Sequence, residues 1–587
     1  MLHNQSKIIM NQSLEHKRHT LAHLLAAAVL EKYPQAKLTL GPAIDTGFYY
    51  DIDFSAGDTP NEEDLKDLQK RMKKLINSWT EFTHEEVSAD KARVIFAGNE
   101  FKTELINEIE AKGETITLYT CGGFTDLCRG GHCESPKAEI DTDAFKLDKM
   151  AGAYWRGDEK KPMLTRIYGL AFETKEELAA YEKQQAEAKT RDHRKLGKEL
   201  DLFTISPLVG AGLPLMKPKG MVIRQELENY LWSLHKDKGY SRVWTPHITN
   251  LSLYETSGHA EKFGDELFRV KGGDEDFALK PMNCPHHMQI FADNQFSYRD
   301  MPVRYFEPAT VYRYEKSGQL SGLTRVRAIT QDDGHLFCRV SQITDEVSTI
   351  VGIIREFYKR MGLLDDYWVS LSVRDDKGMF LGSDEVWAKA EAALEEAAQK
   401  NNLNYKRVEG EAAFYGPKLD FMFKDAIGRE WQLATIQCDF NLPERFDLSF
   451  TNEKGEKERP VVIHRAISGS LERFMGVMIE HFAGNFPLWL APVQLAIIPV
   501  AEIHNEYANK IKTILKEKDY RINLDDSNES MGKKIRNAKK DKLPYFIVIG
   551  DKEVETNTVT LESRDTGESI VLTVDELINK LFSEVNV

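Results

Sequence analysis

A chain of 587 residues is too long for a single hydrophobic core, so we expect three or four domains. Hydrophobic residues make up 41% and charged residues 29%, as in ordinary globular proteins, and no apolar run is long enough to span a bilayer. The net charge of −15 argues against unspecific nucleic-acid binding but leaves room for a local basic patch that faces RNA.

The N-terminus and the cysteines indicate the compartment. The first residues lack the apolar core of a secretion signal. Six cysteines in so long a chain do not make a disulfide scaffold. We therefore expect a cytoplasmic protein without membrane partners, whose thiols are reduced, buried or bound to a metal.

The first third of the chain predicts helices, strands and one irregular stretch. Apolar residues recur at helical spacing over 14–32, and 38–54 reads as strands with a turn. The segment 61–79 reads as a charged helix, and the Gly- and Cys-rich stretch 115–133 reads as a loop. A solvated linker helix follows over 174–200, where Glu, Lys, Ala and Gln predominate. Thr174 and Glu177 fit a capping box at the start of this linker helix.

The rest of the chain predicts two more domains. A strand is predicted over 430–440, and a strand that leads into a helix over 461–476. After Pro487 strands and helices alternate, which predicts a small α/β domain with a mostly parallel sheet.

The most informative stretch runs from Met301 to His335. Arg313 and Glu315 precede a turn that contains Gly and Ser, and Arg325 and Arg327 follow it, on what reads as two strands. Arginine binds phosphate oxygens bidentately. The pattern therefore predicts a polyphosphate site that has no Gly-rich phosphate loop.

Two further clusters contain metal-ligand types. Cys284, His335 and His464 would make a zinc site with one open position, although ordinary buried residues are the more frequent source of such a set. His19 and His23 project from one helix face, and the chain later reads DLCRGGH over 126–132. This second set fits either a zinc site or a histidine pair on a solvated helix face.

Taken together, these motifs resemble the class II aminoacyl-tRNA synthetases. Segment 220–248 is similar to motif 1, 306–327 to motif 2 and 464–474 to motif 3. The sequences MNCP, QDDGH and FYGPKLD narrow the resemblance to the threonyl-tRNA synthetase family. It covers the chain from about His16 to the end.

The resemblance implies an α+β multidomain fold and a reaction. We expect an N-terminal α/β editing domain at 1–172, a linker helix at 173–200, a catalytic domain with an antiparallel sheet at 201–486 and an α/β anticodon-binding domain at 487–587. The implied homodimer activates L-threonine with ATP and Mg²⁺, transfers it to tRNA(Thr) and hydrolyses mischarged Ser-tRNA(Thr). One Zn²⁺ per subunit would bind Cys284, His335 and His464.

The resemblance also assigns roles by position. Arg313 would hold the ATP α-phosphate and the amino-acid carboxylate, and Glu315 would read the adenine amino group. Arg325 and Arg473 would grip the γ-phosphate, which makes Arg313 and Arg473 the expected catalytic residues. The remaining expected ATP contacts are Gln432 and Thr435. The expected threonine contacts are Met282, Gln331, Asp333, Tyr415 and Gln437. The expected editing residues are His19, His23, Tyr50, Lys102, Asp126, Cys128 and His132.

Editing is expected on energetic grounds. A site built for the threonine hydroxyl rejects valine by roughly 10⁴–10⁵. Serine keeps the hydroxyl and lacks only a methyl group, which is worth only about 1–3 kcal/mol. In the family the editing pocket works without a required metal, and a histidine with a pKa near neutrality would order the water. Which histidine does so is left open.

The chain also departs from the family pattern. His286 stands where Gly is usual, and Ser527 and Ser530 stand where Arg and Lys are common, ahead of a basic helix that would meet RNA phosphates or simply be solvated. That helix carries Lys533, Lys534, Arg536, Lys539 and Lys540. Many members begin with a ubiquitin-like domain, so we expect a bacterial-type member that lacks it, by lineage or by trimming.

Two alternative functions stay open at this point. One is a class II ligase of prolyl or seryl specificity, against which Asp333 and the Cys284, His335 and His464 set argue. The other is a non-catalytic RNA-binding paralogue, which would have lost some of these arginines or ligands.

Overall fold

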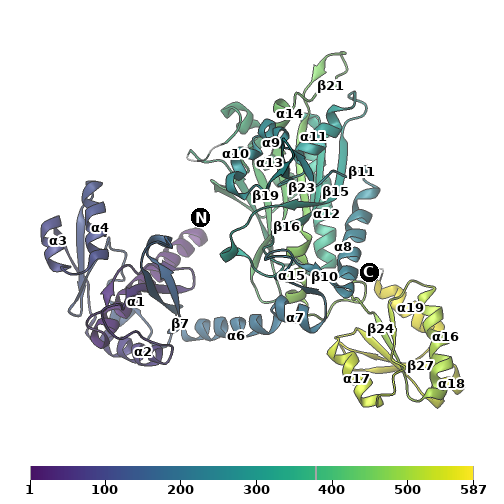
Figure 1. Cartoon of the computed structure of the whole chain (residues 1–587), viewed down its shortest axis with the longest axis horizontal. Helices are drawn as coiled ribbons and strands as arrows, with labels where there is room; N and C mark the ends of the chain where they lie inside the picture. The colour runs from purple at the N-terminus through teal and green to yellow at the C-terminus, as the bar shows by residue number, and fades with distance from the viewer. Residues whose placement is uncertain (1, 377, 379, 586–587) are drawn as a thin grey trace. The chain divides into compact units, whose positions relative to one another are not determined.

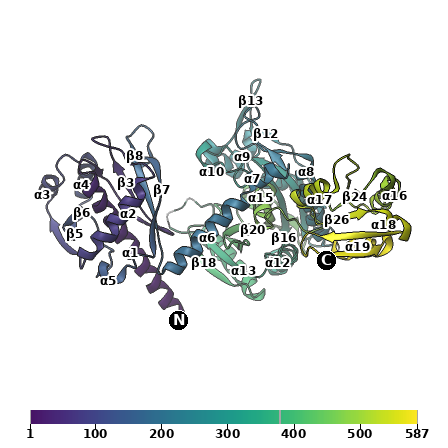
Figure 2. The same cartoon turned by 90° about the horizontal axis from the view of Figure 1, so that it is seen from below.

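The polypeptide folds into two compact units, Met1–Ala186 and Glu187–Val587. The computed structural model describes residues 2–376, 378 and 380–585, and over 2–12 it describes the backbone alone. Figure 1 labels the elements along the chain, and Figure 2 shows them from below. Among the described residues, no helix combines the length and the apolar character needed to cross a bilayer.

The first unit combines an antiparallel sheet with helices. Its main elements are α1 (Leu2–Lys32), β1 (Lys37–Leu38), β2 (Ala43–Ile44), β3 (Gly47–Asp53), α2 (Asp64–Leu75), α5 (Pro136–Glu139), β7 (Phe145–Tyr154) and β8 (Met163–Ala171). The strand order is β1-β3-β8-β7, with β2 paired to β3. Helix α1 lies against β3 and buries Leu21, Leu25 and Val29, so the predicted amphipathic helix, the strands after it and the charged helix are confirmed (Figure 2).

A second, smaller sheet corrects the prediction of a loop over 115–133. Its elements are β4 (Thr83–Val87), α3 (Ala89–Ile95), α4 (Glu100–Ala111), β5 (Ile116–Cys121) and β6 (Phe124–Leu127). Strands β5 and β6 form a hairpin because Gly122 and Gly123 both have positive φ and allow a tight turn. Ile116 and Leu118 both point inward, as alternate residues of a half-buried strand do. Within the stretch predicted as a loop, the irregular part therefore begins after Leu127.

The segment predicted as one solvated linker helix is two helices. They are α6 (Lys175–Arg191), which is largely exposed, and α7 (His193–Glu199), which buries His193 and Leu196. The break occurs at Asp192, whose side chain accepts a hydrogen bond from the backbone N–H of Arg194 and so caps a new helix. At the start of α6, Thr174 caps Glu177 as predicted, whereas the Glu177 carboxylate accepts from the N–H of Glu173 rather than from that of Thr174.

The second unit contains an eight-stranded sheet with the order β11-β15-β16-β23-β20-β19-β17-β18. Its strands are β11 (Tyr240–Arg242), β15 (Val303–Tyr312), β16 (Ala328–Cys338), β17 (Tyr367–Val373), β18 (Tyr405–Glu409), β19 (Lys418–Lys424), β20 (Glu430–Asp439) and β23 (Val461–Ser470). The pairs from β15 to β17 are antiparallel, and only the two edge pairs are parallel. The strands predicted over 430–440 and 461–476 are therefore confirmed at its centre.

Helices and short strands surround this sheet (Figure 1). The helices that share its main core are α8 (Pro218–Lys236), α12 (Ile343–Arg360), α13 (Asp384–Lys400) and α15 (Leu471–His481). The other elements are β9 (Phe203–Thr204), β10 (Leu215–Met216), β12 (Ile248–Asn250), α9 (Leu251–Ser257), α10 (His259–Phe263), β13 (Arg269–Gly272), β14 (Glu275–Leu279), α11 (Cys284–Ala292), α14 (Leu442–Arg445), β21 (Phe450–Thr451) and β22 (Lys457–Glu458).

The C-terminal part has the predicted alternation of strands and helices. Its elements are β24 (Leu495–Pro499), α16 (Asn505–Lys516), β25 (Ile522–Leu524), α17 (Met531–Lys540), β26 (Tyr545–Ile549), α18 (Asp551–Thr556), β27 (Thr558–Ser563), β28 (Ser569–Thr573) and α19 (Val574–Val585). Strand β24 pairs in parallel with β25 and β26, but β26, β27 and β28 pair antiparallel. The sheet is thus mixed rather than mostly parallel, because the short connections after β26 cannot make a crossover.

Candidate functional site

The register of the central strands brings the predicted metal ligands together. His335 on β16 lies opposite His464 on β23, and His464 lies opposite Gln437 on β20. Cys284 enters from the start of α11, and all three predicted ligands are buried. Their potential ligand atoms lie within 4.8 Å of one another, a spacing that a single cation can bridge.

Hydrogen bonds determine which ring nitrogen of His335 and of His464 is available to bind a cation. Nε2 of His464 lies 2.9 Å from Oδ2 of Asp439, and its Nδ1 is buried without a hydrogen-bond partner among the described residues. Nδ1 of His335 lies 2.7 Å from Nδ1 of His287, whose Nε2 lies 3.0 Å from Oε2 of Glu307. Such outer partners orient metal-binding imidazoles, so the residues present fit a cation of the zinc type.

The thiol and a further histidine complete this cluster. Burial, reinforced by the nearby Asp333 and Asp439 carboxylates, raises the pKa of the Cys284 thiol well above its usual range. A bound cation would offset this penalty because it stabilises the thiolate. Nε2 of His259 lies 3.4 Å from the Cys284 sulfur, and burial lowers the pKa of His259 to about 3, so this ring is neutral.

The expected threonine residues surround the same point. Nδ2 of Asn283 donates to Asp333 at 2.9 Å, and the other Asp333 oxygen lies 4.0 Å from Nε2 of His335. The Tyr415 ring stacks on His464 at 4.8 Å, and the Tyr415 hydroxyl donates to Gln437. Met282 is half-buried next to Cys284, and Gln331 lies on β16 beside a bulge that separates it from Asp333 in the pairing with β23.

The expected phosphate-binding arginines lie just outside the strands. Strand β15 ends at Tyr312 and β16 begins at Ala328, so Arg313 and Arg325 belong to the connection, which corrects the prediction that they sit on two strands. Nε of Arg313 donates to the Pro281 carbonyl at 3.4 Å. Nε of Arg325 donates to Glu315 at 2.9 Å, so these two residues pair with each other.

The other expected ATP residues lie on β20 and α15. Arg473 is in the first turn of α15, where its Nε is buried without a partner in the described part of the chain. Burial, with a smaller effect of the Arg325 charge, lowers the pKa of Arg473. An unpaired, desolvated guanidinium beside a second arginine has strong affinity for an anion. Thr435 donates to Asp420 at 2.8 Å, and Gln432 is exposed on the same strand.

A cavity of about 440 Å³ in the first unit collects most of the expected editing residues. It is lined by His19, His23, Tyr50, Lys102, Asp126 and Cys128. His132 does not line it and instead stacks on Phe82 with ring centroids 4.0 Å apart. The cavity is large enough for a nucleoside-sized group.

Contacts in this cavity divide the residues into two groups. The Asp126 carboxylate forms an ion pair with Lys102 and accepts a hydrogen bond from the Tyr50 hydroxyl, so its charge is compensated. The Cys128 sulfur lies 3.5 Å from Nε2 of His19 and 3.3 Å from Nε2 of His132.

Burial shifts the pKa values of these imidazoles and of the thiol in the direction that favours their neutral forms. Burial lowers the pKa of His19, lowers that of His23 well below its usual range, and lowers that of His132 to about 2. Burial also raises the pKa of Cys128 to about 11. A neutral imidazole nitrogen can accept a hydrogen bond from water, which suits these rings to order a water molecule.

Comparisons with known proteins match each part of the chain. A family model described as the tRNA synthetase class II core domain (G, H, P, S and T) matches residues 268–482, and an anticodon binding domain matches 494–584. The threonyl and alanyl tRNA synthetase second additional domain matches residues 116–168. The curated threonine–tRNA ligase of Rubrobacter xylanophilus is 48% identical over 554 residues, which cover 94% of this chain and 85% of that protein.

The chain belongs to the threonine–tRNA ligase family. The threonine–tRNA ligase of Gloeobacter violaceus is 47% identical over 95% of this chain and 90% of its own length. Among solved structures, the RNA binding domain of threonyl-tRNA synthetase from Cryptosporidium parvum superposes with a TM-score of 0.65 at 37% identity, covering 67% of this chain and 98% of that one.

These relatives and family models confirm the family, the fold class and the enzyme class that the sequence analysis expects. A class II core and a second additional domain in one chain support aminoacylation together with editing. The identity of 47–48% to threonine–tRNA ligases disfavours both alternatives, a prolyl- or seryl-specific ligase and a non-catalytic paralogue.

The sequence analysis did not predict the residues that contact and orient the three predicted metal ligands. Asp439 stands two residues after Gln437, so strand alternation alone places both on one face. His287 stands one helical turn after Cys284. His259 had no local signal, because its contact with Cys284 depends on the packing of α10.

The structure places His286, which departs from the family pattern, and the basic helix near the C-terminus. His286 is buried next to the Tyr254 ring, and neither of its nitrogens has a partner among the described residues. On the basic helix α17, Lys534 is buried and donates to the Pro499 carbonyl at 3.4 Å, so it does not face RNA. The exposed basic residues of that helix are Lys533, Arg536, Lys539 and Lys540.

Proposed function

We propose that the second unit forms threonyl adenylate from L-threonine and ATP with Mg²⁺ and then transfers the threonyl group to tRNA(Thr). Arg313 lies between the metal-ligand cluster and the Arg325 turn, so it can contact both reactants and align them for in-line attack. Arg325 and Arg473 neutralise the charge that develops on the leaving phosphates. Glu315 reads the adenine amino group once Arg325 has turned toward phosphate, with Gln432 and Thr435 as further nucleotide contacts.

We propose that Cys284, His335 and His464 hold one Zn²⁺ per subunit. The observation that carries this proposal is the buried Nδ1 of His464, which has no partner in the described part of the chain and lies beside a buried thiol and a second imidazole. When bound, Zn²⁺ supplies a Lewis-acidic position for the amino and hydroxyl groups of threonine. Asp333, Tyr415 and Gln437 orient the substrate around that position, with Met282 and Gln331 beside it.

This arrangement accounts for the need for editing. Valine lacks the hydroxyl and leaves polar groups of the site unsatisfied, whereas serine satisfies them and differs only by a methyl group. In the first unit, His19 and His23 line the cavity, while Asp126 is held by Lys102. We propose that this cavity hydrolyses Ser-tRNA(Thr), with one of these two histidines ordering the water.

The protein acts as a homodimer in this proposal. Trp244, in the motif-1-like segment, is 73% exposed, and Leu208 is 99% exposed. A second copy of the chain would cover them, and the exposed lysines and Arg536 of α17 would contact the anticodon arm of tRNA(Thr).

Metal content and threonylation, measured before and after chelation, test the proposal. We expect one zinc per chain, loss of threonine-dependent pyrophosphate exchange with its removal, and recovery when zinc is restored. Full threonylation by protein that holds no zinc would contradict the zinc site. Exchange stimulated by serine or proline in preference to threonine would contradict the substrate assignment.

A further inference from the structure

His193 occupies an unusual position between the linker and the proposed ATP site. Its Nε2 lies 3.0 Å from the backbone nitrogen of Leu323, which can only donate. Nε2 must therefore be the acceptor, and the ring proton sits on Nδ1, which donates to Oε1 of Glu480 at 2.6 Å. The backbone N–H of His193 donates to the same oxygen at 3.0 Å, so the imidazole is fixed in one neutral tautomer.

The partner of this imidazole is the turn that carries Arg325. Ser321 and Arg325 exchange two backbone hydrogen bonds of 3.1 and 3.2 Å, which close the turn. Gly322 has a φ of +50°, and a Cβ atom there would lie 2.1 Å from Nε2 of His193. The turn and the ring are thus packed against each other, with Leu323 fully buried beneath them.

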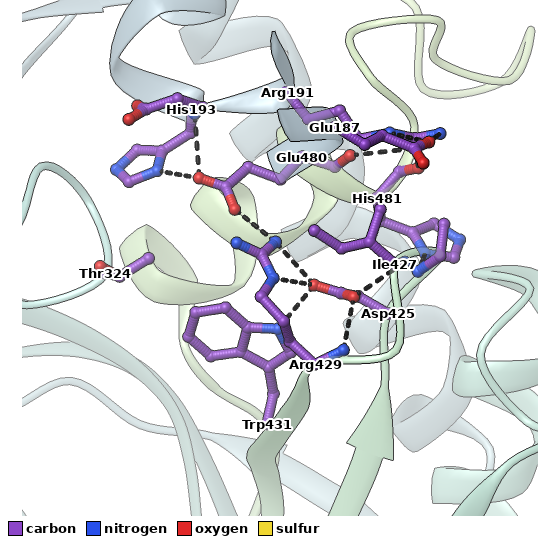
Figure 3. Close-up of polar contacts among 12 residues, drawn as sticks. Glu187, Arg191, His193, Thr324, Asp425, Ile427, Arg429, Trp431, Glu480 and His481 are labelled. Carbon is purple, nitrogen blue, oxygen red and sulfur yellow. Dashed lines mark hydrogen bonds and ion pairs between the residues drawn. The ribbon is translucent and has the colours of Figure 1, made fainter. Parts of the chain in front are cut away.

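Figure 3 shows that contacts continue from His193 through Glu480 and Arg429 toward Asp425 and Trp431. Glu480 pairs with Arg429 at 2.5 Å, and Arg429 donates through Nε to Asp425 at 2.8 Å. Asp425 also accepts a hydrogen bond of 2.9 Å from the Trp431 indole. The Arg473 guanidinium lies 5.7 Å from the centre of the Trp431 ring.

The same cluster has the composition of a metal site, but its geometry argues against one. Potential ligand atoms of Asp192, His193 and Glu480 lie within 4.8 Å of one another. Both ring nitrogens of His193 are already used, one as a donor to Glu480 and one as an acceptor from Leu323. A metal would have to break one of these bonds, so positioning explains the cluster better than ligation.

We infer that His193 is a positioning residue for the adenylation step: its neutral imidazole ties helix α15, through Glu480, to the turn that presents Arg325 to the nucleotide. The inference rests on the proposed role of Arg325 in binding ATP. It predicts that His193 acts on ATP through Arg325 and has no separate effect on threonine or zinc.

A double-mutant cycle in ATP–pyrophosphate exchange tests this inference on the full-length protein. His193→Ala should lower kcat/KM for ATP about tenfold, the effect of leaving the Leu323 N–H without its acceptor. The KM for threonine and the zinc content should not change. His193→Gln should restore part of the activity, because its amide oxygen can accept from Leu323, and Lys198→Ala, an exposed change on the same helix, should match wild type.

The cycle with Arg325→Ala gives the decisive result. We expect the double variant to be no worse than Arg325→Ala alone, because His193 acts through that arginine. Multiplicative losses, or an equal rise in the KM for threonine, would overturn the inference while leaving the proposed function intact. An Arg325→Ala protein with normal kcat/KM for ATP would instead overturn the proposed role of Arg325. If His193→Ala does not fold, the cycle is run with His193→Gln.

Discussion

Oδ2 of Asp439 lies 2.9 Å from Nε2 of His464, and this contact leaves Nδ1 as the only nitrogen of that ring able to bind a metal. Asp439→Asn tests the relationship, because the amide can donate to Nε2 and thereby move the ring proton onto Nδ1. We expect zinc affinity to fall about 10–100-fold, the usual cost of losing an outer-shell partner. Competition with a chelator measures this affinity.

The matched control for that change is Asp447→Asn, which alters an exposed aspartate in the same region. Its zinc affinity should equal that of wild type. The KM for threonine should rise only in Asp439→Asn. Unchanged zinc affinity in Asp439→Asn would argue that His464 does not bind the metal.

His19 lines the editing cavity and contacts Cys128, so His19→Ala should impair hydrolysis alone. We expect deacylation of preformed Ser-tRNA(Thr) to slow by about 10²-fold or more, the usual contribution of a proton-transfer group. Threonylation should stay at the wild-type rate, and Ser-tRNA(Thr) should accumulate. His84→Ala, at an exposed histidine of the same unit, serves as the control. Normal deacylation by His19→Ala would rule out a role for this histidine.

The stability of the first unit should depend on pH through His132. Burial lowers its folded pKa to about 2, whereas the unfolded value is about 6.5. Below pH ~6.5 the unfolded chain binds a proton that the folded chain does not, so this contribution to stability is lost as the pH falls. The loss is about 1.4 kcal/mol per pH unit for this residue.

Hydrogen exchange of residues 14–172 between pH 7.5 and 5.5, corrected for intrinsic rates, measures that dependence. His19 and His23 contribute in the same direction because their pKa values are lowered too. His132→Asn should therefore make the dependence shallower without abolishing it. An identical pH dependence in wild type and His132→Asn would show that the His132 pKa is not lowered in the folded state.

Leu208 is almost fully exposed, and we expect a charge there to disrupt the proposed dimer. We expect Leu208→Asp to shift the molar mass in solution, measured by light scattering, from two chains toward one. Val94→Asp places the same charge on another exposed apolar residue, in the first unit, and should leave the molar mass unchanged. A wild-type protein that is monomeric at micromolar concentration would contradict the dimer.

Much of the local structure followed from the sequence because it depends on short-range patterns. Periodic apolar residues predicted α1, and the sequence also predicted the strand over 430–440 and the strand that leads into a helix over 461–476. The hairpin within 115–133 was missed because its Gly and Cys content outweighed the alternation of Ile116 and Leu118. The break at Asp192 was missed because the linker composition favours helix throughout, and only a side-chain cap divides it.

The sequence by itself determined the types of chemistry available: arginines for phosphate, a Cys and His set for a metal, and a histidine cluster for editing. Only the tertiary structure decided how these groups are oriented. The pairing of His335 with His464, the choice of nitrogen imposed by Asp439, and the tautomer that Glu480 imposes on His193 all join residues far apart in the chain. Sheet register and helix packing set these contacts, and neither is written in any local pattern.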